Sequence, residues 1–237
     1  FTTTVDTEVL LSLIALSARP TIEERIAESV KQIRGAFAIL LMTDYKFIAV
    51  RDSYGFRPLV LGKMENGWCV ASESCAFDLV GAEMVRDVKP GEMVIIDSDN
   101  AEPRSMMWCE KLPEKTAHCI FEYVYFARND SVIDNQPVYD ALIQMGRELA
   151  KETKDIHPDI VISAPDSGTP AAIGYSLESG IPFMEGLNKN RYVGRTFIQP
   201  TQKQRANAVR LKLNPIRSVV AGKSVVMVDD SIAFSNT

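Results

Sequence analysis

Two short apolar runs in the second half of the chain each end in a loop of small polar or acidic residues, and this repeat constrains the fold most. The run Asp159–Ser163 is followed by a loop and then by the helix-like segment Pro170–Glu178, which carries proline in its first turn. The run Ser224–Val228 begins the same order again, with two adjacent aspartates directly behind it. Strands that alternate with helices predict a parallel sheet covered by helices, and such sheets bind ligands at the carboxyl ends of their strands.

The two loops carry groups that suit phosphate and sugar. Gly168 lies between two hydroxyl residues, Ser167 and Thr169, just before the start of a helix, where backbone N–H groups can face a phosphate. Asp229 and Asp230 follow a strand, a position that suits sugar hydroxyls or a hard cation with oxygen ligands. A lone acidic pair is also typical of a helix N-cap, and that alternative stays open.

The charge of the chain is acidic on average but uneven. It has 26 Lys and Arg against 31 Asp and Glu, a net charge of −5, which argues against a nucleic-acid-binding protein. The segment between Gly186 and Arg217 nevertheless contains no acidic residue and eight basic ones: Lys189, Arg191, Arg195, Lys203, Arg205, Arg210, Lys212 and Arg217. This segment is either a solvated basic face or the contact surface of a local polyanionic ligand, and the neighbouring phosphate-type loop favours the ligand.

The first half predicts helices followed by a series of strands. Apolar residues recur at helical spacing in Asp6–Ser17 and again in Glu23–Ile33. Short apolar runs between turn residues then predict strands that are covered on both faces: Ala36–Met42, Phe47–Val50, Leu59–Leu61, Trp68–Ala71 and Met93–Ile96. The polar segment Lys111–Thr116 is the predicted linker, which divides the chain into domains at 1–112 and 113–237.

Several function classes are excluded by simple features of the sequence. Neither a bilayer-spanning apolar run nor a secretory signal is present in it, so we expect a soluble cytoplasmic protein with no membrane partner. The cysteines form no CxxC pair, and most are expected to be buried free thiols: Cys69, Cys75, Cys109 and Cys119. Because the chain begins at Phe1 and stops one step past a strand-like run, we interpret it as a piece of a longer protein.

Several motifs resemble one enzyme family. Val226–Ile232 resembles the core of the phosphoribosyl diphosphate (PRPP) motif of phosphoribosyltransferases. More narrowly, three segments are similar to glutamine phosphoribosyldiphosphate amidotransferases: Phe121–Arg128, Pro165–Pro170 and Lys189–Pro200. In the first half, three further segments resemble the later part of the N-terminal-nucleophile (Ntn) glutaminase domain of that family: Thr3–Glu8, Arg51–Leu59 and Ala71–Ser74.

The resemblance implies a fold and a coupled reaction. The fold would be part of a four-layer αββα Ntn glutaminase, followed by part of a type I phosphoribosyltransferase with a doubly wound parallel sheet. The family hydrolyses glutamine with an N-terminal cysteine, and the ammonia displaces pyrophosphate from PRPP to give 5-phosphoribosylamine, the first committed step of purine synthesis. The parent enzyme would be a homo-oligomer that purine nucleotides regulate. The alternative is a non-catalytic PRPP-sensing protein or a degenerate phosphoribosyltransferase-like one.

The resemblance also implies roles for single residues. Asp6 would bind the α-amino group of glutamine, and its alternative role is to cap the first helix. The residues implied for PRPP are Asp166, Ser167, Gly168, Thr169, Asp229, Asp230, Ser231 and Thr237. Mg²⁺ would be held by Ser167, Asp229 and Asp230 and would stabilise the leaving pyrophosphate. Catalytic residues of a flexible loop that orders over PRPP would be Lys189, Arg191 and Tyr192.

The chain departs from the family in two places. The nucleophilic cysteine belongs upstream of Phe1, so this piece by itself is not expected to hydrolyse glutamine. After Asp-Asp-Ser-Ile the family continues Val-Arg-Gly-Thr-Thr, whereas this chain has Ala233–Thr237 and lacks the glycine that admits the 5′-phosphate. Cys119 lies where some members supply one ligand of a [4Fe-4S] cluster and others keep a cysteine without one. A cluster is therefore an open alternative for the complete parent protein, whose partner ligands would follow Thr237, but not for this piece, because one thiolate cannot hold a cluster.

Overall fold

The chain forms two compact units in the computed structural model, which describes residues 3–98, 102–190, 192 and 211–230. The first unit contains Phe1–Glu122 together with the short segment Ser131–Asn135. The second contains Tyr123–Asp130 and Gln136–Thr237. The chain therefore leaves the first unit, returns to it for five residues, and leaves again. The linker proposed from the sequence at Lys111–Thr116, and the domain limits drawn from it, stay predictions.

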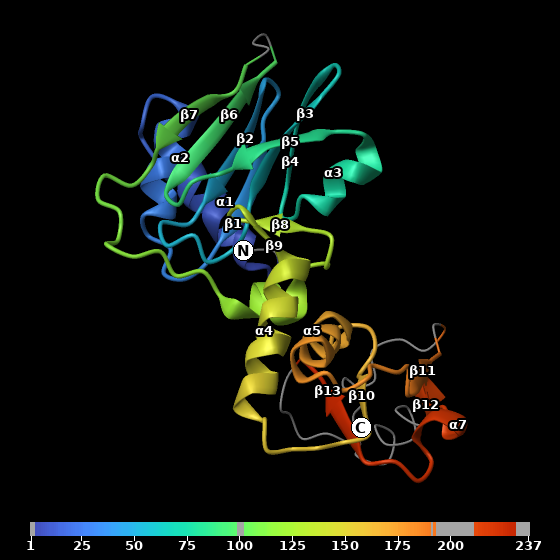
Figure 1. Cartoon of the computed structure of the whole chain (residues 1–237). Helices are drawn as coiled ribbons and strands as arrows, with labels where there is room; N and C mark the ends of the chain where they lie inside the picture. The colour runs from blue at the N-terminus through green and yellow to red at the C-terminus, as the bar shows by residue number, and fades with distance from the viewer. Residues whose placement is uncertain (1–2, 99–101, 191, 193–210, 231–237) are drawn as a thin grey trace. The chain divides into compact units, whose positions relative to one another are not determined.

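The first unit is built on two antiparallel sheets (Figure 1). Strand order is β1-β2-β6-β7 in the four-stranded sheet and β4-β3-β5 in the three-stranded one. The elements of this unit are α1 (Asp6–Leu16), α2 (Ile22–Val30), β1 (Ala38–Met42), β2 (Lys46–Arg51), β3 (Val60–Met64), β4 (Gly67–Ala71), α3 (Cys75–Val80), β5 (Glu83–Asp87), β6 (Glu92–Asp97), β7 (Arg104–Met107) and β8 (Val132–Ile133). Both predicted helices and all five predicted strands are present, with ends that differ by a few residues, whereas β5, β7, β8 and α3 were not predicted.

The four-stranded sheet is buried on both faces along its central strands β2 and β6, whereas the expectation of two covered faces is wrong for the run Ala36–Met42, because β1 is an edge strand with alternate residues exposed. Alternate residues of β2 face opposite sides because side chains of a strand alternate. On one face the sheet packs against α1 and α2 through Leu10, Ile14, Ile26, Val30, Ile48, Val50, Met93 and Ile95. On the other face it packs against the second sheet through Ala49, Leu59, Leu61, Val88 and Val94. Phe77 of α3 lies against Gly62 of β3, so helices and sheets follow the αββα layering expected for the glutaminase fold.

The second unit contains the predicted parallel strands. β10 (Ile160–Ser163) pairs in parallel with β13 (Val225–Val228), so that Ser163 lies opposite Val228. β11 (Leu187–Lys189) and β12 (Leu213–Pro215) form a separate antiparallel pair. The helical elements and the remaining strand are α4 (Val138–Glu152), α5 (Thr169–Ser179), α7 (Arg217–Val220) and β9 (Gln136–Pro137). A π-helix, η1 (Glu122–Phe126), contains the first point at which the chain passes between the units.

Two glycines bring α4 and α5 into backbone contact. A Cβ atom added at Gly146 would collide with the carbonyl oxygen of Ala171, and one added at Gly174 would collide with that of Ile143. Each helix therefore supplies a glycine where the backbone of the other passes closest. This contact fixes α5 and, through it, the loop that joins β10 to α5.

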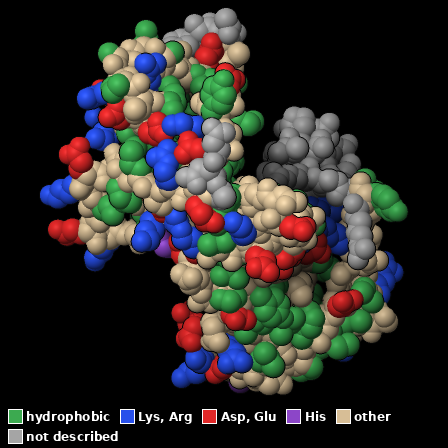
Figure 2. All heavy atoms as spheres, turned by 90° about the horizontal axis from the view of Figure 1, so that it is seen from above, with side chains coloured by type: hydrophobic (Ala, Val, Ile, Leu, Met, Phe, Trp, Pro, Cys, Tyr) green, Lys and Arg blue, Asp and Glu red, His purple; other side chains and the backbone are tan. Residues whose placement is uncertain are grey.

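On the face drawn in Figure 2, acidic and basic side chains of the described residues are interspersed. Over the ranges that the structure describes, every helix is too short or too polar to cross a bilayer.

All four cysteines are free thiols, as predicted, but the expectation that most are buried is wrong. Only Cys75 is buried, because it starts α3 beneath the second sheet, while Cys69, Cys109 and Cys119 are partly exposed.

Candidate functional site at the carboxyl ends of the parallel strands

The loop between β10 and α5 is fixed by its own hydrogen bonds and by β13. Ala164 donates its N–H to the carbonyl of Val228 at 2.9 Å, and Gly168 donates to the carbonyl of Ala164 at 3.1 Å. The hydroxyls of Ser163 and Thr169 lie 3.0 Å apart across the base of the loop. The loop therefore closes on itself directly beside the end of β13.

Gly168 is the point at which the two strand-end loops touch. It is buried, and a Cβ atom there would lie 2.5 Å from the Val228 carbonyl oxygen and 3.2 Å from the Cα atom of Asp229. No side chain fits this space without moving backbone. Glycine is therefore required here for close approach of two backbones rather than for an unusual torsion angle.

We expect Gly168→Ala to push the β10–α5 loop away from β13. The added methyl group meets backbone on two sides, so the loop has to shift, and the change should cost about 1–3 kcal/mol of stability. Affinity for Mg²⁺-pyrophosphate should fall as well, measured by calorimetry together with urea unfolding. Gly67→Ala is the control, because the nearest atom to a Cβ there is a methionine methyl carbon 4.0 Å away. Equal effects of the two substitutions would contradict the proposed close approach.

The two aspartates behind β13 form an acidic tip. Asp230 donates its backbone N–H to Asp229 Oδ1 at 2.9 Å. Asp229 keeps access to solvent, yet the protein atoms around its carboxyl group raise its pKa, and the neighbouring Asp230 carboxylate raises it further. A carboxylate that is partly desolvated beside a like charge gains from a cation. The acidic tip is therefore suited to hold positive charge.

Two hollows flank the β10–α5 loop. One, of about 480 Å³, is lined by Ser167, Gly168, Asp229 and Asp230 and by a side of α4 that carries both apolar residues and the polar residues Gln144, Glu148 and Glu152. The other, of about 450 Å³, is lined mainly by polar groups, among them Asp166, Thr169, Glu185 and Lys189. The prediction that the two strands are parallel is confirmed. The expectation that Asp166 and Asp229 surround a single cleft is wrong in detail, because the loop separates them into the two hollows.

Lys189 reaches the loop from β11. Its ammonium group forms an ion pair with the carboxylate of Asp166. β11 is held in place because Lys189 pairs with Leu213 of β12 and Asn190 donates its N–H to the Lys212 carbonyl at 2.7 Å. The first basic residue of the acid-free segment is thus positioned beside the predicted pyrophosphate loop.

The donor set at the acidic tip fits a magnesium ion that arrives with a phosphate ligand. Among the described residues, no group of three or more His, Cys, Asp or Glu side chains could form a complete metal cage. Mg²⁺ does not require one, since it is commonly bound by one or two carboxylates together with substrate phosphates and water. Asp229 and Asp230 provide such a pair, with Ser167 on the same hollow.

Some predicted site residues lie outside the described part of the chain. These are Arg191, Ser231 and Thr237, and the altered segment Ala233–Thr237 lies there too. Tyr192 is described and is almost fully exposed, with its N–H donated to Asn190 Oδ1 at 3.0 Å. Its catalytic role stays a prediction.

Asp6 and Cys119, the site residues predicted in the first unit, are both accessible. Asp6 is the first residue of α1, whereas Val5 occupies the N-cap position, and α1 has no side-chain capping bond. The capping alternative for Asp6 is therefore not supported, and its exposed carboxylate is available to a ligand. Cys119 is a partly exposed free thiol, and the described residues offer no set of partner ligands for a [4Fe-4S] cluster.

Both halves of the chain are similar to known proteins. Residues 1–78 match the family model described as a glutamine amidotransferase domain. The amidophosphoribosyltransferase of Mycobacterium tuberculosis (strain H37Rv) is 47% identical over 99% of this chain and 44% of its own length. That of Bacillus subtilis (strain 168) is 46% identical over 100% of this chain and 49% of its own length. The chain spans about half the length of these curated relatives.

A solved structure agrees over the same range. The glutamine PRPP amidotransferase of B. subtilis, complexed with ADP and GMP, superposes with a TM-score of 0.88 at 47% identity, over 98% of this chain and 50% of that one. Fold and sequence together define the class, because the chain is homologous to glutamine-dependent phosphoribosyltransferases on both sides of the unit boundary. Within that class, the proteins that it matches are amidophosphoribosyltransferases, and it spans about half of their length.

Proposed function

We propose that this chain is the part of an amidophosphoribosyltransferase that joins its glutamine-hydrolysing and PRPP-binding halves. The complete enzyme would convert PRPP, glutamine and water to 5-phosphoribosylamine, glutamate and pyrophosphate in the cytoplasm, as a homo-oligomer that purine nucleotides regulate. The observation that carries this proposal is the acidic tip Asp229–Asp230 beside the loop Asp166–Thr169, at the carboxyl ends of two paired parallel strands.

Each part of this site has a task in binding PRPP. Backbone N–H groups at the start of α5 face the diphosphate, because a helix N-terminus carries partial positive charge. Asp229 and Asp230 hold the ribose hydroxyls and a Mg²⁺ ion carried by the diphosphate, with Ser167 beside them. The ion, when bound, supplies positive charge that stabilises the leaving pyrophosphate. Lys189 contributes a fixed ammonium group from the opposite side of the loop.

The glutamine half contributes Asp6. Its exposed carboxylate at the start of α1 is an anion for the α-amino group of glutamine, since an ammonium group binds best to a fixed carboxylate. The nucleophilic N-terminal cysteine of the family has no counterpart among the residues of this chain. We therefore assign glutamine hydrolysis to the full-length gene product.

Calorimetric titration of the 237-residue chain with Mg²⁺ and PRPP tests the binding half of the proposal. We expect saturable binding that requires both the metal and the diphosphate, so ribose 5-phosphate with Mg²⁺ should bind at least about tenfold more weakly. The full-length gene product should in addition release pyrophosphate from PRPP with either glutamine or ammonia. Equal affinity for ribose 5-phosphate and PRPP would contradict the assignment of the loop, and binding without any pyrophosphate release would favour the PRPP-sensing alternative.

A further inference from the structure

The ion pair between Lys189 and Asp166 joins two elements that are each fixed against β10. Asp166 lies in the loop that directly follows β10, and its side chain is 78% exposed, whereas that of Lys189 is 28% exposed. The chain before β11 runs along β10, since Val161 donates to the carbonyl of Pro182 at 3.0 Å and Met184 donates to that of Val161 at 2.9 Å. The backbone segments that carry the two side chains are therefore both positioned by β10.

Gly186 fixes the approach of β11 to the sheet. A Cβ atom there would lie 2.6 Å from a methyl carbon of Ile162, the residue next to the end of β10. Ile216 donates its N–H to the carbonyl of Gly186 at 2.9 Å, which ties the same point to the far end of the basic segment. Lys189 follows three residues later and is held over the hollow of about 450 Å³ that Asp166, Thr169 and Glu185 also line.

A carboxylate at this place is unexpected in a site for a diphosphate. Asp166 repels any phosphate oxygen that enters the hollow, and it also neutralises the ammonium group that would attract one. A free phosphate ion therefore meets little net positive charge. A diphosphate that carries a divalent cation differs, because the cation lowers the net negative charge of the complex and so its repulsion by Asp166, while the outer diphosphate oxygens take Lys189.

We infer that Asp166 is a specificity-determining residue: through its ion pair with Lys189, it makes the loop reject free phosphate and accept diphosphates that carry a divalent cation. This inference rests on the proposed function, which assigns the loop to a diphosphate. Asp166 is then not a direct ligand of PRPP, as first expected, but a residue that lowers the affinity of the loop for free phosphate. Such selectivity prevents free phosphate from competing with the diphosphate for the loop.

Binding of two probes, inorganic phosphate and Mg²⁺-pyrophosphate, tests the inference in the 237-residue chain and its Asp166→Asn, Asp166→Glu and Lys189→Gln variants. Asp166→Asn should bind phosphate about fivefold more tightly, as expected for release of a largely exposed ion pair. Its preference for Mg²⁺-pyrophosphate over phosphate should fall at least as much. Asp166→Glu should keep the preference of the original chain, and Lys189→Gln should lose affinity for both probes. Asp155→Asn, an exposed aspartate that precedes β10, controls for the change in net charge.

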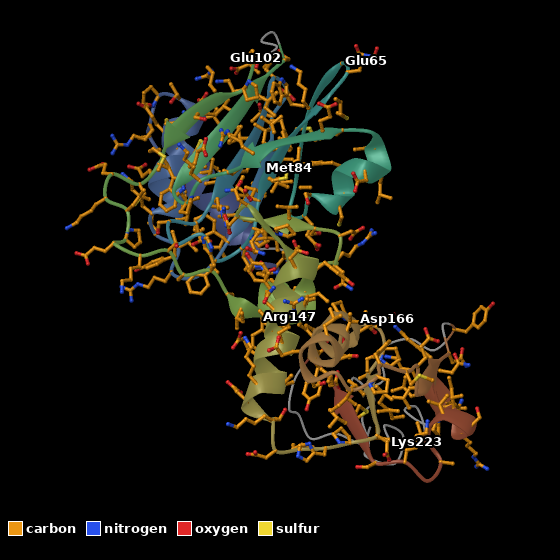
Figure 3. The ribbon with its side chains drawn as sticks, in the orientation of Figure 1. Glu65, Met84, Glu102, Arg147, Asp166 and Lys223 are labelled. Carbon is orange, nitrogen blue, oxygen red and sulfur yellow. The ribbon has the colours of Figure 1, made fainter. Side chains whose placement is uncertain are left out.

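Amine-reactive footprinting provides a readout that needs no ligand. Lys223 lies before β13 and Asp166 after β10, so Lys223 is at the opposite end of the strand pair and serves as the internal reference (Figure 3). Labelling of Lys189 relative to Lys223 should rise several-fold in Asp166→Asn because the ion pair shields the amine. Unchanged labelling, or phosphate affinity that does not rise above that of Asp155→Asn, would overturn the inference. Failure of the original chain to bind Mg²⁺-pyrophosphate would instead contradict the proposed function.

Discussion

Substitution of Asp229 and Asp230 together by asparagine should abolish synthesis of phosphoribosylamine by the full-length gene product. The amides keep the shape of the acidic tip but lose the charge that attracts the cation. Metal-assisted charge stabilisation contributes several kcal/mol, so the rate with ammonia as nitrogen donor should fall by about a hundredfold or more. Pyrophosphate release from PRPP and ammonia is the measurement.

The same double variant should keep most of its basal glutaminase activity, because Asp6 and the acidic tip belong to different units. Asp6→Asn provides the mirror-image control, with glutamine-dependent synthesis lost and ammonia-dependent synthesis retained. Near-normal ammonia-dependent synthesis in Asp229→Asn with Asp230→Asn would show that the acidic pair is only a local cap. The assignment of the site would then have to be withdrawn.

Loss of the charge on Asp134 is expected to destabilise the first unit strongly. Arg51 is only 1% exposed, and Asp134 accepts hydrogen bonds from its guanidinium group at 3.0 and 3.1 Å. The other donors of Arg51 reach the carbonyls of Gly55, Arg57 and Val88. These carbonyls carry no formal charge, so Asp134 is the carboxylate that pairs directly with the buried cation.

Asp134→Asn should therefore destabilise the unit by about 3 kcal/mol, since removal of one partner leaves a buried charge uncompensated. Asparagine is the informative substitution because Asp134 has a φ of 47°, a left-handed conformation that asparagine tolerates. Asp130→Asn is the matched control, since Asp130 pairs with Arg128 on the surface, where such pairs contribute about 0–1 kcal/mol. Urea unfolding of both variants measures the difference, and similar midpoints would contradict the role of Asp134.

The sequence predicted most of the fold because its apolar runs are short and well separated by turn residues. A short apolar run of this kind forms a strand when it is buried in a sheet, and each of the five runs in the first half is a strand in the structure. β5 and β7 were missed because they carry charged residues such as Glu83, Arg86 and Arg104, so their alternation is weak. In the second half, the repeated order of strand, loop and helix was sufficient to predict the parallel pair β10–β13.

Contacts within the site were less predictable than its location. Motifs place Asp166 and Lys189 near a phosphate, but their ion pair depends on how the chain before β11 runs along β10, and Gly186 contributes to this through its contact with Ile162. Arg51 and Asp134 are separated by 83 positions, and no local pattern links them. A signal for the turn was nonetheless present, because Asp134-Asn135 between short apolar and polar runs is typical of a tight turn with positive φ.

The return of Ser131–Asn135 to the first unit affects how such a protein can be recombined in evolution. A single crossover after Glu122 would transfer the helices and sheets of that unit but leave behind the carboxylate that neutralises Arg51. The chimera would inherit a buried cation without the carboxylate that forms its ion pair, and we expect selection to remove it. Functional exchange with another family therefore has to carry the segment through Asn135 as well, so the beginning of the second unit, Tyr123–Asp130, travels with the first.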